Sequence, residues 1–129
     1  MPLRLRGSNG DDVLSGEGGS YQLIGGKGDD TYIVDDIGDK VIEKANGGID
    51  TVLSYISYQL GKNLEHLTLL GSSDIDGTGN SKDNRITGNS GAKSLYGLGG
   101  DDTLDGGAGD DSLYGGESDD LLIGGTGSD

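Results

Sequence analysis

The sequence predicts an all-β fold in which the chain winds into a parallel solenoid, because three features recur together along its 129 residues. The first is a repeat with a period of nine residues. The second is a six-residue segment of each repeat that is rich in Gly and Asp. Such a segment is typical of turns, since Gly supplies positive φ and Asp tolerates it. The third is one apolar position per repeat among polar or mixed neighbours, which is typical of a short strand with one buried face.

The first block of repeats lies near the N-terminus, after a short segment at 1–6 that we interpret as a tail. Its copies are 7–15, a worn copy at 16–24, and 25–33, which is close to ideal. Within each copy the first six residues form the predicted turn and the last three form the predicted strand. Tyr21 stands where the other two copies carry Asp as their sixth residue.

The middle of the chain, 35–76, is less regular. The stretches 40–43, 50–60 and 64–70 are rich in apolar residues and predict strands, with turns between them that include 46–48. Asp39 keeps the step of nine residues after Asp30, but Asp50 follows eleven residues later, so the register slips. We interpret this stretch as irregular coils of the same solenoid, because its apolar residues are too dense for a linker.

A second block of repeats fills 77–129 in the same register. It contains two partial copies, three good ones and an incomplete last one: 79–87 and 88–96, then 97–105, 106–114 and 115–123, then 124–129. The whole chain is therefore predicted to be one continuous solenoid with a tail at 1–6, repeats at 7–34, irregular coils at 35–76 and repeats at 77–129.

The eighth residue of every full copy is apolar and predicts the buried face of the strands. A helix would tolerate neither this much Gly nor a strict period of nine residues. The residues at this position are Leu14, Leu23, Tyr32, Ile86, Leu95, Leu104, Leu113 and Leu122.

The composition leaves little apolar material for a core. Leu, Ile and Val make up just over a fifth of the chain, Phe and Trp are absent, and 28 residues are Gly. The net charge is −14, so a compact chain repels itself unless cations neutralise it. Cysteine is also absent, which excludes disulfides and thiolate–zinc sites and leaves another kind of metal site as the candidate staple.

The same charge argues against two classes of partner. Nucleic acid and anionic membrane surfaces both require clustered Lys and Arg, and the chain has only 9 basic residues against 23 acidic ones. No apolar run approaches the roughly 20 residues of a membrane span. We therefore expect no nucleic-acid partner and no membrane span.

The repeat resembles the haemolysin-type calcium-binding repeat (RTX), whose pattern is GGxGxDxUx. The match is close at 25–33 and 106–114, and good at 7–15, 97–105 and 115–123. The resemblance implies a right-handed parallel β-roll in which two repeats form one coil, so that turns two repeats apart stack and share a calcium ion. Calcium takes six to eight oxygen ligands in a tolerant geometry, which a Gly-rich turn and an Asp can supply.

The resemblance also implies which residues bind the ions. It pairs Asp12 with Asp30, Asp102 with Asp120, and Asp111 with Asp129, so several calcium ions are expected. Backbone carbonyls of the turns complete the implied ligand set: those of Gly7, Asn9, Gly25, Lys27, Gly97, Gly99, Gly106, Ala108, Gly115 and Glu117.

Departures from the pattern are predicted to weaken other sites. Tyr21, opposite Asp39, supplies no carboxylate. Lys93, opposite Asp111, places a cation where the metal should lie, so we expect that site to be lost.

Two further departures are predicted to weaken a site. Asn84, opposite Asp102, offers one neutral amide oxygen. Ser118 replaces a glycine that the turn uses for positive φ, at a cost of about 1 kcal/mol, which affects the turn that carries Asp120.

Metal binding and folding are expected to be one event in such a chain. Extracellular modules bind calcium with a Kd of about 10⁻⁴–10⁻³ M, so cytosolic calcium would leave the chain unfolded and calcium outside the cell would fold it. The resemblance implies type I secretion. We expect a secreted, extracellular module without enzyme activity, part of a larger polypeptide, that stabilises or assists export of an attached enzyme, toxin or adhesin.

Two alternatives remain open. A polysaccharide-binding module of a secreted carbohydrate-active enzyme is one, because Tyr96 and Tyr114 are eighteen residues apart and should stack on one face of the roll. Good β-propensity explains the same tyrosines without a ligand. A fragment of an enzyme active site is the other, and it has less support because His66 is the only histidine and no catalytic set can be assembled.

Overall fold

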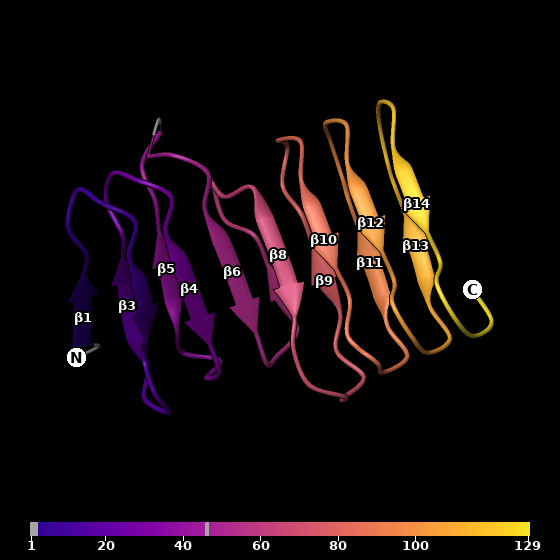
Figure 1. The fold of residues 1–129 in the computed structure, drawn as a ribbon, viewed down its shortest axis with the longest axis horizontal. Helices are drawn as coiled ribbons and strands as arrows, with labels where there is room; N and C mark the ends of the chain where they lie inside the picture. The colour runs from indigo at the N-terminus through magenta and orange to yellow at the C-terminus, as the bar shows by residue number, and fades with distance from the viewer. Residues whose placement is uncertain (1–2, 46) are drawn as a thin grey trace.

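The computed structural model describes residues 3–45 and 47–129, and the regular elements within them are all strands. Each strand runs parallel to its neighbours, and the chain climbs from one end of the stack to the other (Figure 1). The predicted all-β parallel solenoid is confirmed. The described part of the chain contains no helix that could cross a membrane. Met1 and Pro2 of the predicted tail, and Asn46 of the predicted turn at 46–48, lie outside the described residues.

Most strands occupy the last three residues of a repeat, directly after its Gly-Asp turn. The segment expected as a tail contributes β1. In chain order the strands are β1 (Leu3–Arg6), β2 (Val13–Ser15), β3 (Tyr21–Ile24), β4 (Thr31–Val34), β5 (Lys40–Ile42), β6 (Thr51–Ser54), β7 (Tyr58–Gln59), β8 (His66–Leu69), β9 (Gly77–Thr78), β10 (Arg85–Thr87), β11 (Ser94–Tyr96), β12 (Thr103–Asp105), β13 (Ser112–Tyr114) and β14 (Leu121–Ile123).

The strands alternate between two walls of the solenoid. One wall is a seven-stranded sheet in the order β14-β12-β10-β8-β6-β4-β2. The other wall is divided into the sheets β1-β3-β5 and β13-β11-β9-β7. In the repeat blocks, paired residues are eighteen positions apart, as Leu104 with Leu122 and Leu95 with Leu113 show. Two repeats therefore make one coil, as the resemblance implies.

The middle coils have other lengths. Val52 pairs with Tyr32, twenty residues before it, and with Leu67, fifteen residues after it. The expected strand at 50–60 is two strands, β6 and β7, separated by a bend at 55–56. β5 and β7 belong to different sheets, so the second wall divides where the nine-residue register slips.

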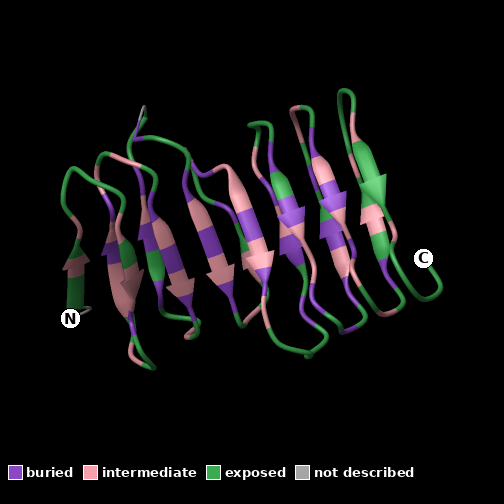
Figure 2. Cartoon of the chain, in the orientation of Figure 1, coloured by how far each residue is buried: buried purple, intermediate pink, exposed green. Residues whose placement is uncertain are grey.

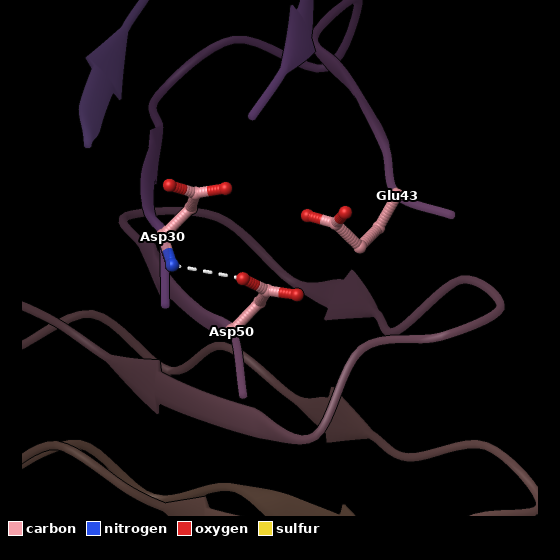
Figure 3. A group of neighbouring side chains, drawn as sticks. All are labelled: Asp30, Glu43 and Asp50. Carbon is pink, nitrogen blue, oxygen red and sulfur yellow. Dashed lines mark hydrogen bonds between the residues drawn. The ribbon is translucent and has the colours of Figure 1, made fainter. Parts of the chain in front are cut away.

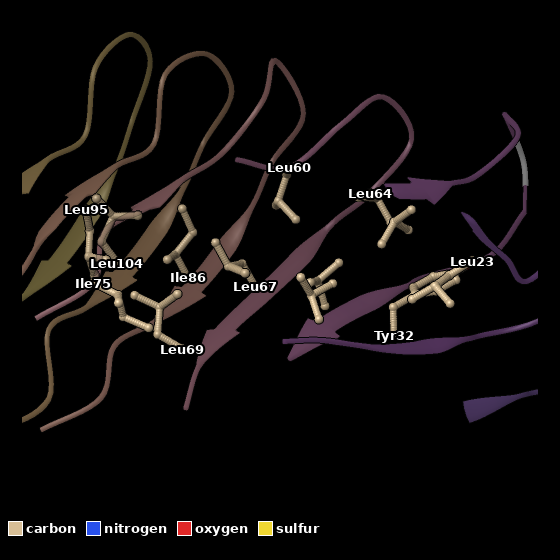
Figure 4. Close-up of a cluster of buried hydrophobic side chains, with 13 residues drawn as sticks. Leu23, Tyr32, Leu60, Leu64, Leu67, Leu69, Ile75, Ile86, Leu95 and Leu104 are labelled. Carbon is tan, nitrogen blue, oxygen red and sulfur yellow. The ribbon is translucent and has the colours of Figure 1, made fainter. Parts of the chain in front are cut away.

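The core is a single file of apolar side chains between the walls (Figure 4). The predicted position-eight residues Leu23, Tyr32, Ile86, Leu95 and Leu104 are all fully buried. At the C-terminal end of the stack the pattern weakens, because all three residues of β14 are exposed (Figure 2).

The turns depend on glycine at positions where no side chain fits. Gly109 has a φ of 102°, and a Cβ added to it would lie 2.5 Å from the carbonyl oxygen of Gly91 in the preceding coil. Ser118 adopts a φ of 75°, in the region that favours glycine, as predicted from its place in the repeat. Close stacking of the turns therefore requires glycine at positions such as Gly109.

Candidate metal centre

Turns two repeats apart are joined through the sixth-position aspartates. The backbone N–H of one Asp donates to Oδ1 of the Asp in the next coil. The structure brings together the three pairs expected from the sequence: Asp12 with Asp30 at 2.9 Å, Asp102 with Asp120 at 2.8 Å, and Asp111 with Asp129 at 3.0 Å.

The second carboxylate oxygen of several of these aspartates has no protein partner. Oδ2 of Asp102 and Oδ2 of Asp111 are buried, and neither accepts a hydrogen bond within the described part of the chain. A Cβ added to Gly97 would meet Oδ2 of Asp102 and, at 2.7 Å, the carbonyl oxygen of Gly115. Glycine at the first turn position thus lets a carboxylate of one coil and a carbonyl of the next approach one point.

Lys93 shows what such a point binds. Its side chain replaces the sixth-position Asp and is fully buried in an ion pair with Asp111. Nζ donates to Oδ1 of Asp111 at 2.7 Å and to the carbonyl oxygens of Gly106 at 2.8 Å and Ala108 at 3.0 Å. The oxygens of the first, third and sixth turn residues therefore converge on a cation, and the ammonium group lies where the sequence predicts it.

A buried carboxyl without such a cation is destabilised in its charged form. Burial raises the pKa of Asp102 to about 6, and the negative charge of Asp120 acts in the same sense, against the backbone N–H of Asn84. A bound cation would reverse this shift, since an opposite charge favours the carboxylate.

The carbonyl of the first turn residue faces the preceding coil. The oxygen of Gly25 lies 2.8 Å from where a Cβ of Gly7 would be, next to the Asp12 carboxylate. Gly124 supplies the equivalent oxygen at Gly106, at 2.7 Å. Gly124 was not predicted, because its repeat breaks off at the sixth residue.

The other predicted carbonyl donors divide into two groups. Those of Gly106 and Ala108 bind Lys93, and that of Gly97 lies 2.8 Å from the Cβ position of Gly79, on the side of the coil that carries Asn84. For the rest the role stays a prediction from the pattern: Gly7, Asn9, Lys27, Gly99 and Glu117.

Two sixth-position side chains are partly saturated by their own turn. The N–H of Ser8 donates to Oδ2 of Asp12 at 2.6 Å, and the Ser8 hydroxyl reaches both carboxylate oxygens. The amide oxygen of Asn84 accepts a bond from the N–H of Asn80 at 2.8 Å. We infer that these positions are weaker ligands than Asp102 or Asp111.

A third carboxylate joins the aspartate column in the irregular middle. Oδ1 of Asp50 accepts a hydrogen bond from the N–H of Asp30 at 2.8 Å, and Glu43 lies beside both (Figure 3). One oxygen atom from each of the three side chains falls within 4.8 Å of the other two. Burial, followed in order by the charge of Glu43, raises the pKa of both aspartates against the effect of a backbone hydrogen bond to each.

These oxygen sets suit calcium better than a softer metal. Carboxylate and carbonyl oxygens are the donors that hard cations prefer, and Ca²⁺ accepts six to eight of them at 2.3–2.6 Å in flexible geometry. The Oδ2 atoms without a partner and the carbonyl oxygens beside the glycines lie at points where a cation fits. At one such point the cation is the ammonium group of Lys93.

Comparison with known proteins identifies the repeats. The family described as RTX calcium-binding nonapeptide repeat (4 copies) matches residues 4–32, 78–113 and 96–129, which together exceed half of the chain. The matched ranges overlap both predicted blocks of repeats, and none of them covers 35–76. Repeats of this family bind calcium.

Two curated relatives come from Rhizobium meliloti (strain 1021). Endo-1,3-1,4-beta-glycanase ExsH is 37% identical over 64% of this chain, and Endo-1,3-1,4-beta-glycanase EglC is 36% identical over 66% of it. The match spans only 18% of the length of each relative. No solved structure matches the chain significantly. With its nonapeptide turns, stacked aspartates and parallel coils, the chain belongs to the RTX calcium-binding repeat family.

Proposed function

We propose that the chain is a secreted, non-enzymatic module that folds when calcium binds and stabilises an attached protein. The observation that carries the proposal is the set of buried carboxylate oxygens without a hydrogen-bond donor, such as those of Asp30 and Asp102. They lie in the same stack as one turn in which Lys93 supplies a cation. A buried charge without a partner either takes up a proton or prevents folding, so the other turns require a cation too.

The apolar core is too small to replace that cation. Among the described residues it consists of 13 buried apolar residues, and the net charge of the chain is −14. Small domains of this kind depend on disulfides, metals or oligomers, and the chain has no cysteine. Metal binding is thus proposed to supply folding free energy directly.

The proposed ligands link neighbouring coils. At the turn between 97–105 and 115–123, Asp102 and Asp120 supply carboxylates, and Gly115 and Glu117 supply carbonyl oxygens in the positions that Gly106 and Ala108 occupy around Lys93. Calcium supplies positive charge and a cross-link between two turns. The same assignment applies to Asp12 with Asp30 and to Asp111 with Asp129.

A calcium titration of chelator-stripped protein tests this function. We expect far-UV circular dichroism to show a cooperative gain of β signal with millimolar calcium and no gain with magnesium, which holds to stricter octahedral geometry. Full β signal in chelator, unchanged by calcium, would show that the core folds alone and would reject the proposal.

The attached protein is proposed to be a secreted enzyme, and the relatives suggest a carbohydrate-active one. Both are endo-1,3-1,4-beta-glycanases, and in both the similarity is confined to a small part of the protein. A repeat module joined to a catalytic region accounts for that pattern. We propose export of the unfolded chain by type I secretion, followed by folding in extracellular calcium, with 7–34, 35–76 and 77–129 as parts of one solenoid.

A polysaccharide-binding role is the second candidate. Tyr96 and Tyr114 are exposed on neighbouring strands and stack with centroids 4.9 Å apart and ring planes 5° apart. Each ring therefore covers one face of the other, which leaves less aromatic face for a sugar than two coplanar rings would offer. Retardation of the protein in gels that contain mixed-linkage β-glucan, abolished by Tyr114→Ala, would favour this role.

A further inference from the structure

We propose that Asp30, Glu43 and Asp50 form an additional calcium site in the irregular middle of the solenoid, and that this site binds its ion more tightly than the repeat sites. The site deepens the proposed function, on which it rests for the choice of calcium as the ion. Two of its three ligands, Glu43 and Asp50, lie outside the nine-residue repeats.

The three side chains come from two successive coils and point toward one another (Figure 3). Asp30 precedes β4, Glu43 follows β5 and Asp50 precedes β6. One oxygen of each lies within 4.8 Å of the others. Two oxygens bound to one calcium ion at 2.3–2.6 Å are at most about 5 Å apart, so these separations fall within the span of one calcium ion.

Two oxygen atoms in the cluster are unsatisfied. Asp30 is 1% exposed and Asp50 is fully buried, yet Oδ2 of each accepts no hydrogen bond from any described residue. Natural proteins rarely leave such atoms without a partner, and a bound ion is one established reason. The remaining Oδ1 of each Asp is already bound to a backbone N–H, of Asp12 and Asp30 respectively.

No basic side chain neutralises the cluster within the described residues. The two ion pairs there are Lys82 with Glu65 and Lys93 with Asp111. The cluster thus holds three acidic groups without a cationic side chain, whereas the turn at Lys93 holds an ammonium group beside its carboxylate. A divalent cation would offset most of that charge.

Tyr32 holds the third carboxylate in place. Its hydroxyl donates to Oε2 of Glu43 at 2.5 Å and accepts a bond from the N–H of Gly25 at 2.9 Å. The N–H of Lys44 donates to Oε1 at 3.1 Å. Glu43 is therefore held in one orientation before an ion binds, and calcium affinity rises with ligand charge and with rigidity of the site. The repeat sites have two carboxylates each, so the cluster should fill first.

Terbium, which binds at calcium sites, tests the proposal in the complete chain. Excited tyrosine transfers energy to a nearby terbium ion, and the Tyr32 hydroxyl touches the cluster. We expect the first equivalent of terbium to give sensitised emission. In Glu43→Gln we expect its affinity to fall at least tenfold and the emission to disappear from the first binding phase.

Two further variants make the outcome decisive. Tyr32→Phe keeps all three carboxylates but removes the bond that holds Glu43, so terbium affinity should fall less than in Glu43→Gln while the emission of the first phase falls. This readout remains if Glu43→Gln folds poorly. Asp102→Asn should weaken a later ion and leave the first phase unchanged.

The outcomes separate this site from the proposed function. An unchanged first phase in Glu43→Gln, or a first phase lost in Asp102→Asn, would overturn the cluster site while calcium-driven folding could stand. A first phase that depends on Glu43, in a chain whose β signal ignores calcium, would uphold the site and reject calcium-driven folding.

Discussion

At the scale of single residues, Lys93 shows most directly that the turns can bind a cation. Its ammonium is enclosed by Asp111 and two carbonyl oxygens, with the side chain fully buried. A buried ion pair of this kind does not by itself imply stability, but removal of one partner costs about 3–5 kcal/mol because the other charge is left buried. Lys93 therefore makes one turn independent of calcium.

Substitution of Lys93 separates the ion pair from the metal site. In Lys93→Asp we expect one more calcium ion per chain than in the parent, counted by isothermal titration, because the repeat regains its sixth-position carboxylate. Lys93→Met is the control, with the ion pair removed and no ligand added. Without calcium, the free energy of unfolding of both variants should be lower by about 3–5 kcal/mol, because the buried charge of Asp111 loses its partner. Equal calcium counts in all three proteins would contradict this assignment.

At the scale of elements, each turn is joined to the next through backbone N–H groups that donate to aspartate side chains, the sixth-position ones first. The fifth-position aspartates add a second set of bonds, since Oδ1 of Asp101 accepts from the N–H of Asp119 at 3.0 Å and Oδ1 of Asp83 from the N–H of Asp101 at 2.8 Å. These exposed aspartates stitch the turns in the opposite direction to the sixth-position ones. By contrast, the sixth-position carboxylates of Asp30, Asp102 and Asp111 are buried, and each has an oxygen without a hydrogen-bond partner among the described residues.

A methyl group in a stacked turn should be costly even when calcium is saturating. We expect Gly109→Ala to lower the free energy of unfolding by about 1–3 kcal/mol, because the residue has positive φ and its Cβ would meet the Gly91 carbonyl. Gly61→Ala is the matched control, since a Cβ there meets nothing within 4 Å. Urea unfolding measures both, and equal effects would show that the turns have room to spare.

The nine-residue register predicts the elements wherever it holds. It places Leu104 in the core and Lys93 on Asp111, because each follows from counting along the repeat. It does not place Asp50 with Asp30, because the extra residues in the turn between β5 and β6 lengthen the step to twenty. Glu43 is brought to them by that same turn, which no periodicity describes. β1 was missed because four alternating residues without a turn motif give too little signal.

At the scale of the whole molecule, the carboxyls along the stack act together on stability. Without metal, burial raises the pKa of Asp30, Asp50 and Asp102 above the ordinary value of 3.8, to about 7 for Asp50 and to about 6 for Asp102. Protonation therefore favours the folded chain. This stabilisation is complete below about pH 4 and is lost as the pH rises through about 6 to 7.

The sign of the pH dependence should reverse when calcium is present. In calcium-free buffer we expect more β signal at pH 5 than at pH 8. At saturating calcium we expect stability to fall toward pH 5, because protons compete with the metal for the same oxygens. Thermal unfolding followed by circular dichroism at both pH values checks the two signs. Asp102→Asn should reduce the pH dependence of stability in calcium-free buffer. The same sign of pH dependence in both buffers would contradict the idea that protons and calcium compete for the buried carboxylates.

The parallel stacking of the coils also has a mechanical consequence. The two chain ends lie at opposite ends of the stack (Figure 1), so tension between them pulls along the direction in which the strands hydrogen-bond, coil from coil. With strands about 4.8 Å apart, seven coils separate the ends by roughly 30 Å, whereas the extended chain would span on the order of 400 Å. Each ion between coils then cross-links two successive coils along the direction of the tension. Calcium would set both the length of this spacer and the force at which its coils begin to unfold, one at a time.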